Sequence, residues 1–199
     1  MTQSLLRDTL APFRWSTEPA SWQVADALEL TTRPDTDYWQ RTHYGFRRDN
    51  GHFFFVPMAG DFSPTAHVAF APNAQYDQCG VMCRASADSW IKASVEYEPD
   101  GHSRLGSVVT NLGYSDWATQ DVESTLDRLW YRLSRRGADF CVESSADGVA
   151  WQQMRITHLH DCPEQIEAGV YACSPVGAGF ACRVLSLTLG ANVWRTAGE

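Results

Sequence analysis

Apolar and polar side chains alternate along many short stretches of this chain. Between residues 78 and 97, one set of alternate positions is apolar and comprises Cys79, Val81, Cys83, Ala85, Ile91, Ala93, Val95 and Tyr97. The intervening set mixes polar and bulky residues and comprises Gln78, Gly80, Met82, Arg84, Trp90, Lys92, Ser94 and Glu96. Successive side chains of a β-strand point to opposite faces. The pattern therefore predicts two strands, each of which has one face buried in a core. Residues 129–136 repeat the pattern, with Leu129, Tyr131 and Leu133 on the core side.

Turn-forming sequences separate these stretches. Four of them place glycine after a polar residue, namely Asp49-Asn50-Gly51, Pro99-Asp100-Gly101, Arg136-Gly137 and Asp147-Gly148. Glycine readily adopts the positive φ values of tight hairpins, so each sequence predicts a hairpin. Further strands are expected at 140–143, 149–156, 168–173 and 180–189. Many short strands joined by tight turns predict an all-β sandwich or barrel.

The segment from 110 to 130 departs from this pattern. Thr110-Asn111 and Ser115-Asp116-Trp117 combine turn-forming and polar residues, which favours a loop after a strand. Val122, Leu126 and Leu129 have helical spacing, so a short helix over 121–130 is an alternative. A loop that leads into a strand is the favoured interpretation.

Composition narrows the class of protein. The chain has 199 residues, with 24 Asp and Glu against 16 Lys and Arg, and a formal net charge of −8. One domain over residues 1–199 is expected at this length. The acidic balance argues against nucleic-acid and anionic-membrane partners, which need clustered cations. No stretch approaches the roughly 18 apolar residues of a membrane helix, and residues 1–14 lack the apolar core of a signal peptide, so a cytoplasmic protein is expected.

Six cysteines stand at positions 79, 83, 141, 162, 173 and 182. In a cytoplasmic protein we expect them to be free thiols within strands rather than three disulfides. His158, His160, Asp161 and Cys162 have the chemistry of metal ligands, but a polar loop is favoured because a third ligand would have to come from an adjacent residue. Glycine-rich nucleotide-binding motifs are absent from the sequence, so no cofactor is expected.

The polar faces of the predicted strands carry large aromatic residues, which a merely solvated face rarely shows. Aromatic rings stack on the apolar faces of sugars, while amides and charges bond to hydroxyl groups. We therefore expect a binding surface on which Gln78, Lys92, Glu96 and Arg132 line one pocket, with Arg84 on the same face. The alternatives are a wetted sheet with incidental aromatic residues, and a simple ion pair of Glu96 with Lys92 or Arg84.

Further motifs follow one another over about residues 10–190. They are Asp35-Thr36-Asp37-Tyr38-Trp39, Arg41–Phe46, Gly60-Asp61-Phe62, Tyr76–Gly80, Trp90–Glu96, Val108–Asn111, Ser115-Asp116-Trp117, Ser145–Gly148 with Trp151, and Ser174-Pro175 with Gly179-Phe180. As a set they resemble a family of unknown function that has a concanavalin A-like lectin/glucanase fold and is sometimes labelled for regulation of enolase. The resemblance implies a two-sheet antiparallel, jelly-roll-like sandwich, whose concave face holds sugar in carbohydrate-active relatives of the fold. It implies no established reaction.

Together, the faces and the resemblance predict a non-catalytic module that binds a carbohydrate or small sugar metabolite on the concave sheet. Asn111, Asp116 and Trp117 are candidate sugar contacts on a loop. Trp39 is either a stacking platform or a core residue.

Glycoside hydrolysis is the alternative, because it needs two carboxyl groups close together. Glu96 is the candidate catalytic residue, with Glu98 or Asp116 as the second acid. Glucanases of this fold carry Glu-x-Asp-x-Glu on one strand, whereas Ser94, Glu96 and Glu98 stand at the matching positions here, one acid short. A third hypothesis, drawn from the family's label, is a regulatory protein that binds a metabolic enzyme.

Overall fold

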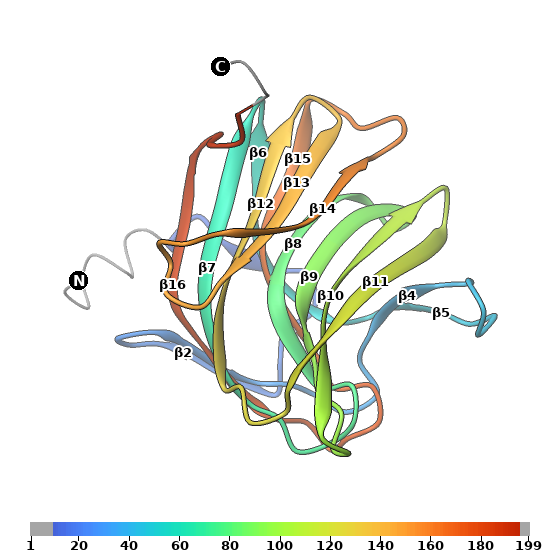
Figure 1. Cartoon of the computed structure of the whole chain (residues 1–199), viewed down its shortest axis with the longest axis vertical. Helices are drawn as coiled ribbons and strands as arrows, with labels where there is room; N and C mark the ends of the chain where they lie inside the picture. The colour runs from blue at the N-terminus through green and yellow to red at the C-terminus, as the bar shows by residue number, and fades with distance from the viewer. Residues whose placement is uncertain (1–9, 196–199) are drawn as a thin grey trace.

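The computed structural model describes residues 10–195, and strands dominate it (Figure 1). The strands are β1 (Arg14–Trp15), β2 (Ser21–Val24), β3 (Leu28–Thr31), β4 (Tyr38–Gln40), β5 (Arg47–Asp49), β6 (His52–Ala59), β7 (Phe62–Ala71), β8 (Gln78–Ser86), β9 (Ser89–Glu96), β10 (His102–Asn111), β11 (Tyr114–Glu123), β12 (Arg128–Arg136), β13 (Asp139–Ser145), β14 (Gln152–His158), β15 (Gln165–Cys173) and β16 (Ala181–Ala191). Within this range no helix is long and apolar enough to cross a lipid bilayer.

Fourteen of these strands form two seven-stranded antiparallel sheets that pack face to face. Sheet A has the order β1-β6-β15-β8-β9-β10-β11, and sheet B has the order β14-β13-β12-β7-β16-β3-β2. The remaining two strands, β4 and β5, pair only with each other. The predicted two-sheet antiparallel sandwich is therefore confirmed, and the barrel is excluded.

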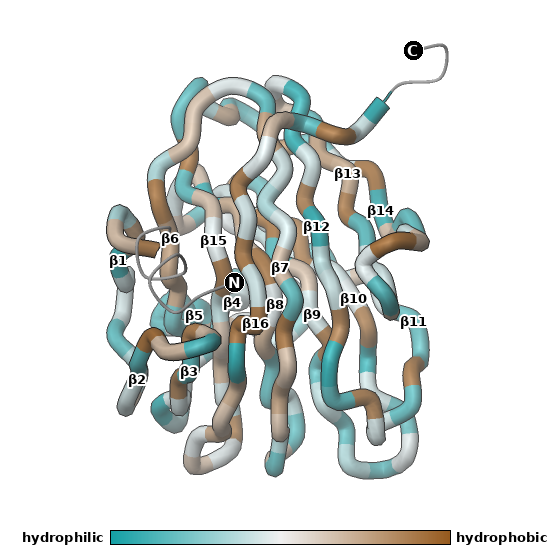
Figure 2. The backbone as a smooth tube through the Cα atoms, turned by 90° about the vertical axis from the view of Figure 1, so that its left-hand side faces the viewer, coloured by the Kyte–Doolittle hydropathy of each residue, from teal (hydrophilic) through white to brown (hydrophobic). Residues whose placement is uncertain are grey.

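The main core lies between the two sheets, and the predicted alternation accounts for it. Its members from the predicted core sets are at most 6% exposed, namely Cys79, Val81, Cys83, Ile91, Ala93, Val95, Leu129, Tyr131 and Leu133. Figure 2 shows hydrophobic and hydrophilic positions following one another along β7, β12 and β16. One face of each sheet is thus removed from water, and this burial is the main driving force for folding.

Three of the four predicted hairpins are confirmed. Gly101, Gly137 and Gly148 all have positive φ, and each lies between two strands that pair with each other. The sequence Asp49-Asn50-Gly51 is the exception, because β5 does not pair with β6. Gly51 instead lies where a Cβ atom would approach the Tyr38 ring to within 2.3 Å, so glycine is needed there for close packing.

The loop expected at Ser115-Asp116-Trp117 and the alternative helix over 121–130 are wrong, whereas the favoured loop that leads into a strand is present at 124–127, before β12. Residues 114–123 form β11, which pairs along its full length with β10. This strand is the edge of sheet A, and most of its residues are exposed, so it lacks the apolar alternation that identifies a half-buried strand. A two-residue turn at Leu112 and Gly113, both with positive φ, joins β10 to β11.

All six cysteines are free, as the sequence predicts. Five are buried, and Cys162 is half-buried. The five buried cysteines are small apolar residues of strands, and Cys162 lies between β14 and β15.

Candidate functional site

The β4–β5 hairpin lies over the outer face of sheet A. Figure 1 shows it on the side of β8–β11 that faces away from sheet B. Its buried Tyr38 ring packs edge-on against Trp90 and Tyr171, with ring centroids 6.1 and 6.2 Å away. This contact creates a second apolar cluster, whose buried members are Tyr38, Phe53, Phe55, Met82, Trp90, Val108, Tyr171 and Cys173. The hairpin therefore explains why the polar-side residues Met82 and Trp90 are fully buried.

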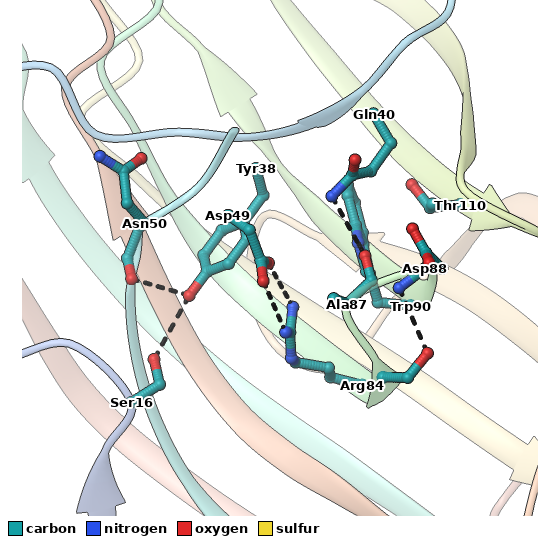
Figure 3. A network of polar contacts seen from close by, with 12 residues as sticks. Ser16, Tyr38, Gln40, Asp49, Asn50, Arg84, Ala87, Asp88, Trp90 and Thr110 are labelled. Atoms are coloured by element: carbon teal, nitrogen blue, oxygen red, sulfur yellow. Dashed lines mark hydrogen bonds and ion pairs between the residues drawn. The ribbon is translucent and has the colours of Figure 1, made fainter. Parts of the chain in front are cut away.

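Polar contacts fix the base of the hairpin to the sheet (Figure 3). The guanidinium of Arg84 donates two hydrogen bonds, of 2.6 and 2.8 Å, to the carboxylate of Asp49. The Tyr38 hydroxyl donates to the carbonyl of Gly51 at 2.7 Å, and the Gln40 side chain donates to Ala87. Burial lowers the pKa of Arg84, but the bonds to Asp49 outweigh it and hold that pKa above its ordinary value. Arg84 therefore stays positively charged while it anchors the hairpin.

Between the hairpin and the sheet lies a pocket of about 390 Å³. Its walls come from the hairpin, from β8, β9 and β11, and from the loops before β4, before β8 and after β15. The lining residues are Asp35, Asp37, Trp39, Tyr44, Phe46, Arg48, Tyr76, Gln78, Lys92, Glu96, Trp117, Pro175 and Val176. The volume is within the range of small-molecule sites. Five of the lining residues are aromatic, and three ionisable ones, Lys92, Asp37 and Glu96, lie close together.

Lys92 lies at the floor of this pocket with only 2% of its side chain exposed. Its ammonium donates a 2.6 Å hydrogen bond to Oε1 of Gln78. Oδ1 of Asp37 and Oε1 of Glu96 each lie 3.7 Å from the same Nζ. The Tyr171 hydroxyl is 3.0 Å from the Gln78 oxygen and holds that amide in place from below. A buried ammonium is thereby surrounded by three acceptors, which compensates the loss of its hydration.

The pKa of Glu96 is raised to about 7, mainly by burial. The Lys92 ammonium lowers this pKa, whereas repulsion by the carboxylates of Asp37 and Glu98 raises it further. Its side chain is 12% exposed, and the exposed part faces the pocket. Glu96 can therefore hold or release a proton near neutral pH. Perturbed carboxyl groups in clefts are characteristic of functional sites.

Two further wall residues, Asp35 and Tyr76, have left-handed backbone conformations, with φ of 56° and 66°. Such conformations are uncommon for residues other than glycine and are costly unless the surroundings hold them. Hydrogen bonds do so here, because the Asn50 side chain donates to the Asp35 carbonyl and the Tyr76 amide donates to the Tyr97 carbonyl. Both strained residues line the same pocket.

Five of the nine residues expected to bind a ligand line this pocket: Trp39, Gln78, Lys92, Glu96 and Trp117. Trp39 is a half-buried wall residue whose Nε1 donates to the Thr42 carbonyl. Arg84 lies under the hairpin on the same face of the sheet, but it anchors Asp49 and does not line the pocket.

The other three expected residues lie elsewhere. Arg132 is on the outer face of sheet B, where its Nε donates to Glu143 at 2.8 Å and its guanidinium stacks on Trp151. The expected convergence with Lys92 is wrong because β12 belongs to the second sheet, and alternation along a strand does not say which sheet the strand joins. The cation that joins Lys92 in the pocket is Arg48.

Asn111 and Asp116 lie in β10 and β11 rather than on a loop, and neither lines the pocket. The Asn111 side chain bonds to the backbone at His158 and His160, and so ties β10 to the end of β14. Asp116 is exposed and pairs with Arg155 at 2.7 Å. Glu98 likewise lies outside the lining, with its carboxylate bonded to Gln75.

Several lining residues escaped the sequence analysis. Asp37 is the carboxylate closest to the Lys92 and Glu96 pair, and the acidic, aromatic composition of the 35–39 motif was the one available signal. Tyr44, Phe46 and Arg48 belong to the hairpin, whose position over sheet A cannot be read from periodicity. In the part of the chain that the structure describes, no group of three or more His, Cys, Asp or Glu residues is arranged to hold a metal ion.

Comparison with known proteins gives a family and two kinds of relative. Residues 15–191 match the family described as "Protein of unknown function (DUF1349)". The chain is 34% identical over 167 residues to "Regulation of enolase protein 1" of Saccharomyces cerevisiae, and the match covers 83% of each protein. The resemblance that the sequence motifs indicated is therefore confirmed.

Solved structures extend this comparison. A functionally unknown protein from Saccharomyces cerevisiae superposes with a TM-score of 0.86 at 31% identity, over 93% of this chain and 99% of that one. A variant of the GH43 protein BlXynB from Bacillus licheniformis superposes with a TM-score of 0.71 at 17% identity, over 90% of this chain and 37% of that one. The second likeness is one of fold alone.

Proposed function

The chain belongs to the DUF1349 family of proteins of unknown function, and from that premise we propose that it binds a carbohydrate in the pocket between the β4–β5 hairpin and sheet A. The observation that carries the proposal is the arrangement at the floor. Carboxylate oxygens of Asp37 and Glu96 each lie 3.7 Å from the Lys92 ammonium, which is beyond hydrogen-bond distance. Aromatic side chains line the walls of the same pocket.

This arrangement suits hydroxyl groups in particular. A hydroxyl is both donor and acceptor, so one sugar hydroxyl can accept from Lys92 and donate to Asp37 or Glu96. Hydrogen bonds to charged partners are the stronger ones, and they gain strength in a site that excludes water. A ligand with neighbouring hydroxyls can therefore bond to the ammonium and to the carboxylates, which are too far apart to bond to each other.

The aromatic walls supply the other half of sugar recognition. Trp39 and Trp117 are half-buried, so each ring keeps surface available to a ligand. The apolar C–H faces of a sugar ring can stack on such surfaces while its hydroxyls reach the floor. Amphipathic ligands such as sugars match a pocket with one polar end and aromatic sides.

Isothermal titration of the purified protein with neutral mono- and oligosaccharides of glucose, xylose and mannose tests this proposal. We expect a dissociation constant below about 1 mM for at least one series, and at least a tenfold loss in Trp117→Ala. Arg132→Ala is the matched control, because it removes an aromatic-stacked residue from the opposite sheet and should leave binding unchanged. The absence of any binding at 10-fold higher sugar concentrations would refute the proposal.

Glycoside hydrolysis is the second candidate, and the raised pKa of Glu96 beside Asp37 favours it. Two carboxyl groups close together, one of them with a raised pKa, form the acid–base arrangement of glycosidases. Both lie 3.7 Å from one Nζ, so they are no more than twice that distance apart. Release of nitrophenol from aryl glycosides, abolished in Glu96→Gln and Asp37→Asn, would support catalysis; no release by the wild-type protein would leave binding alone.

A protein partner is a third possibility, suggested by the name of the yeast relative. Co-migration of the purified chain with purified enolase in size-exclusion chromatography would test it, and separate elution at micromolar concentrations would argue against it.

A reducing compartment such as the cytoplasm is supported by the six free thiols.

A further inference from the structure

The loop between β4 and β5 exposes two aromatic rings at the mouth of the pocket. Tyr44 is 54% exposed and Phe46 is 42% exposed, and both line the pocket. Their rings are stacked, with centroids 5.7 Å apart and an interplanar angle of 21°. Large apolar side chains that gather in the open beside a concave site indicate a surface that a ligand covers.

This loop is held in one conformation. Its ends are joined by hydrogen bonds from the Arg41 amide to the Phe46 carbonyl, and from the Gly45 amide back to the Arg41 carbonyl, of 2.8 and 2.7 Å. The Trp39 indole donates to the loop at Thr42, and its ring lies edge-on to Tyr44 at 5.6 Å. A preorganised aromatic surface binds with less loss of conformational entropy than a mobile one.

The opposite end of the pocket is closed. Gln78 and Lys92 are each 2% exposed, and Tyr171 lies directly behind them. A ligand unit that reaches this floor cannot pass through it. The exposed lining residues that a further unit can meet are Tyr44, Phe46 and the 63% exposed Val176.

From this layout we propose that the pocket binds an oligosaccharide, and that Tyr44 and Phe46 form an outer subsite that stacks on the next sugar of the chain. The inner unit occupies the Lys92, Asp37 and Glu96 floor, and the outer unit lies against the exposed ring pair. The inference rests on the proposed carbohydrate binding and adds to it the length of the ligand.

Titration with two ladders of neutral sugars tests the outer subsite. Cello-oligosaccharides and xylo-oligosaccharides of one to four units are compared in the wild-type protein, Tyr44→Ala, Phe46→Ala and Tyr114→Ala. Tyr114 is the matched control, because it is 58% exposed near the same hairpin but lies outside the pocket. Thermal unfolding of each variant shows that it is folded, which we expect because the replaced rings are exposed.

We expect the affinity to rise about 3- to 10-fold from one unit to two or three, as stacking on an aromatic surface implies. The rise should disappear in Tyr44→Ala and Phe46→Ala, and should persist in Tyr114→Ala. Equal affinities for one unit and for three, unaffected by Tyr44→Ala, would overturn the outer subsite while carbohydrate binding stands. Failure of both ladders and of their monosaccharides to bind would overturn the outer subsite together with the binding proposal.

Discussion

Replacing Glu96 by Gln provides a direct measure of the electrostatics at the pocket floor. The substitution keeps the shape of the side chain and removes its titration. In the folded protein the pKa of Glu96 is raised to about 7, from its ordinary value of 4.5, mainly through burial. The folded state therefore holds the proton more tightly than the unfolded state, so the wild-type protein must lose stability as the pH rises between these two values.

The magnitude follows from the size of the shift. One pKa unit corresponds to about 1.4 kcal/mol, so deprotonation of Glu96 should cost about 3 kcal/mol of folding free energy between pH 4.5 and pH 8. The side chain is only 12% exposed, so screening by solvent reduces this value little. The cost is absent below pH 4.5, where the carboxyl is protonated in both states.

Urea unfolding at several pH values measures this effect as a difference between two proteins. The stability of Glu96→Gln minus that of the wild type should increase by about 3 kcal/mol from pH 4.5 to pH 8. The subtraction cancels the pH-dependent contributions of His52 and His67 to stability. Burial lowers the pKa of both, so their contributions increase with pH, opposite to that of Glu96. A difference that stays constant with pH would refute the account of Glu96.

Other predictions concern the hairpin and its contacts. Arg84→Ala should lower the unfolding free energy by about 1–3 kcal/mol, because it leaves Asp49 without its partner, and hydrogen exchange should quicken in residues 38–49 while the main core stays protected. Gly51→Ala should cost about 1–3 kcal/mol in chemical unfolding, because its Cβ would overlap the Tyr38 ring; wild-type stability would show that the ring can shift. Arg132→Ala should weaken sheet B locally without changing a sugar titration, and a loss of sugar affinity would contradict the assignment of Arg132 to the opposite face.

The sandwich was predictable because its strands obey two simple rules. Alternation in β8, β9 and β12 identifies the faces that exclude water, and glycine at the turns after β9, β12 and β13 marks the hairpins. The rules failed where one of their conditions was missing. The edge strand β11 is exposed on both faces along most of its length, so it carries no alternation to detect.

The site was only partly predictable, and for a different reason. Gln78, Lys92 and Glu96 come from adjacent antiparallel strands with the same facing, so their proximity follows from register. Arg132 has the same local pattern but belongs to the other sheet, and local alternation contains no information about that choice. Asp37 and the aromatic residues reach the pocket through a hairpin whose docking depends on long-range contacts such as Arg84 with Asp49.

The roof and the floor of the pocket have separate origins in the chain. The floor is made of strands whose other face is the main core, so most changes to their backbone would disturb the whole sandwich. The roof of the pocket is the β4–β5 hairpin, a short segment between β3 and β6. Among the contacts described, its loop residues 41–46 do not touch the main core. Relatives could therefore diverge in ligand choice by altering the hairpin loop alone, while the scaffold and its buried lysine are inherited intact. Exchanging this loop between family members is a practical route to new specificities on one stable framework.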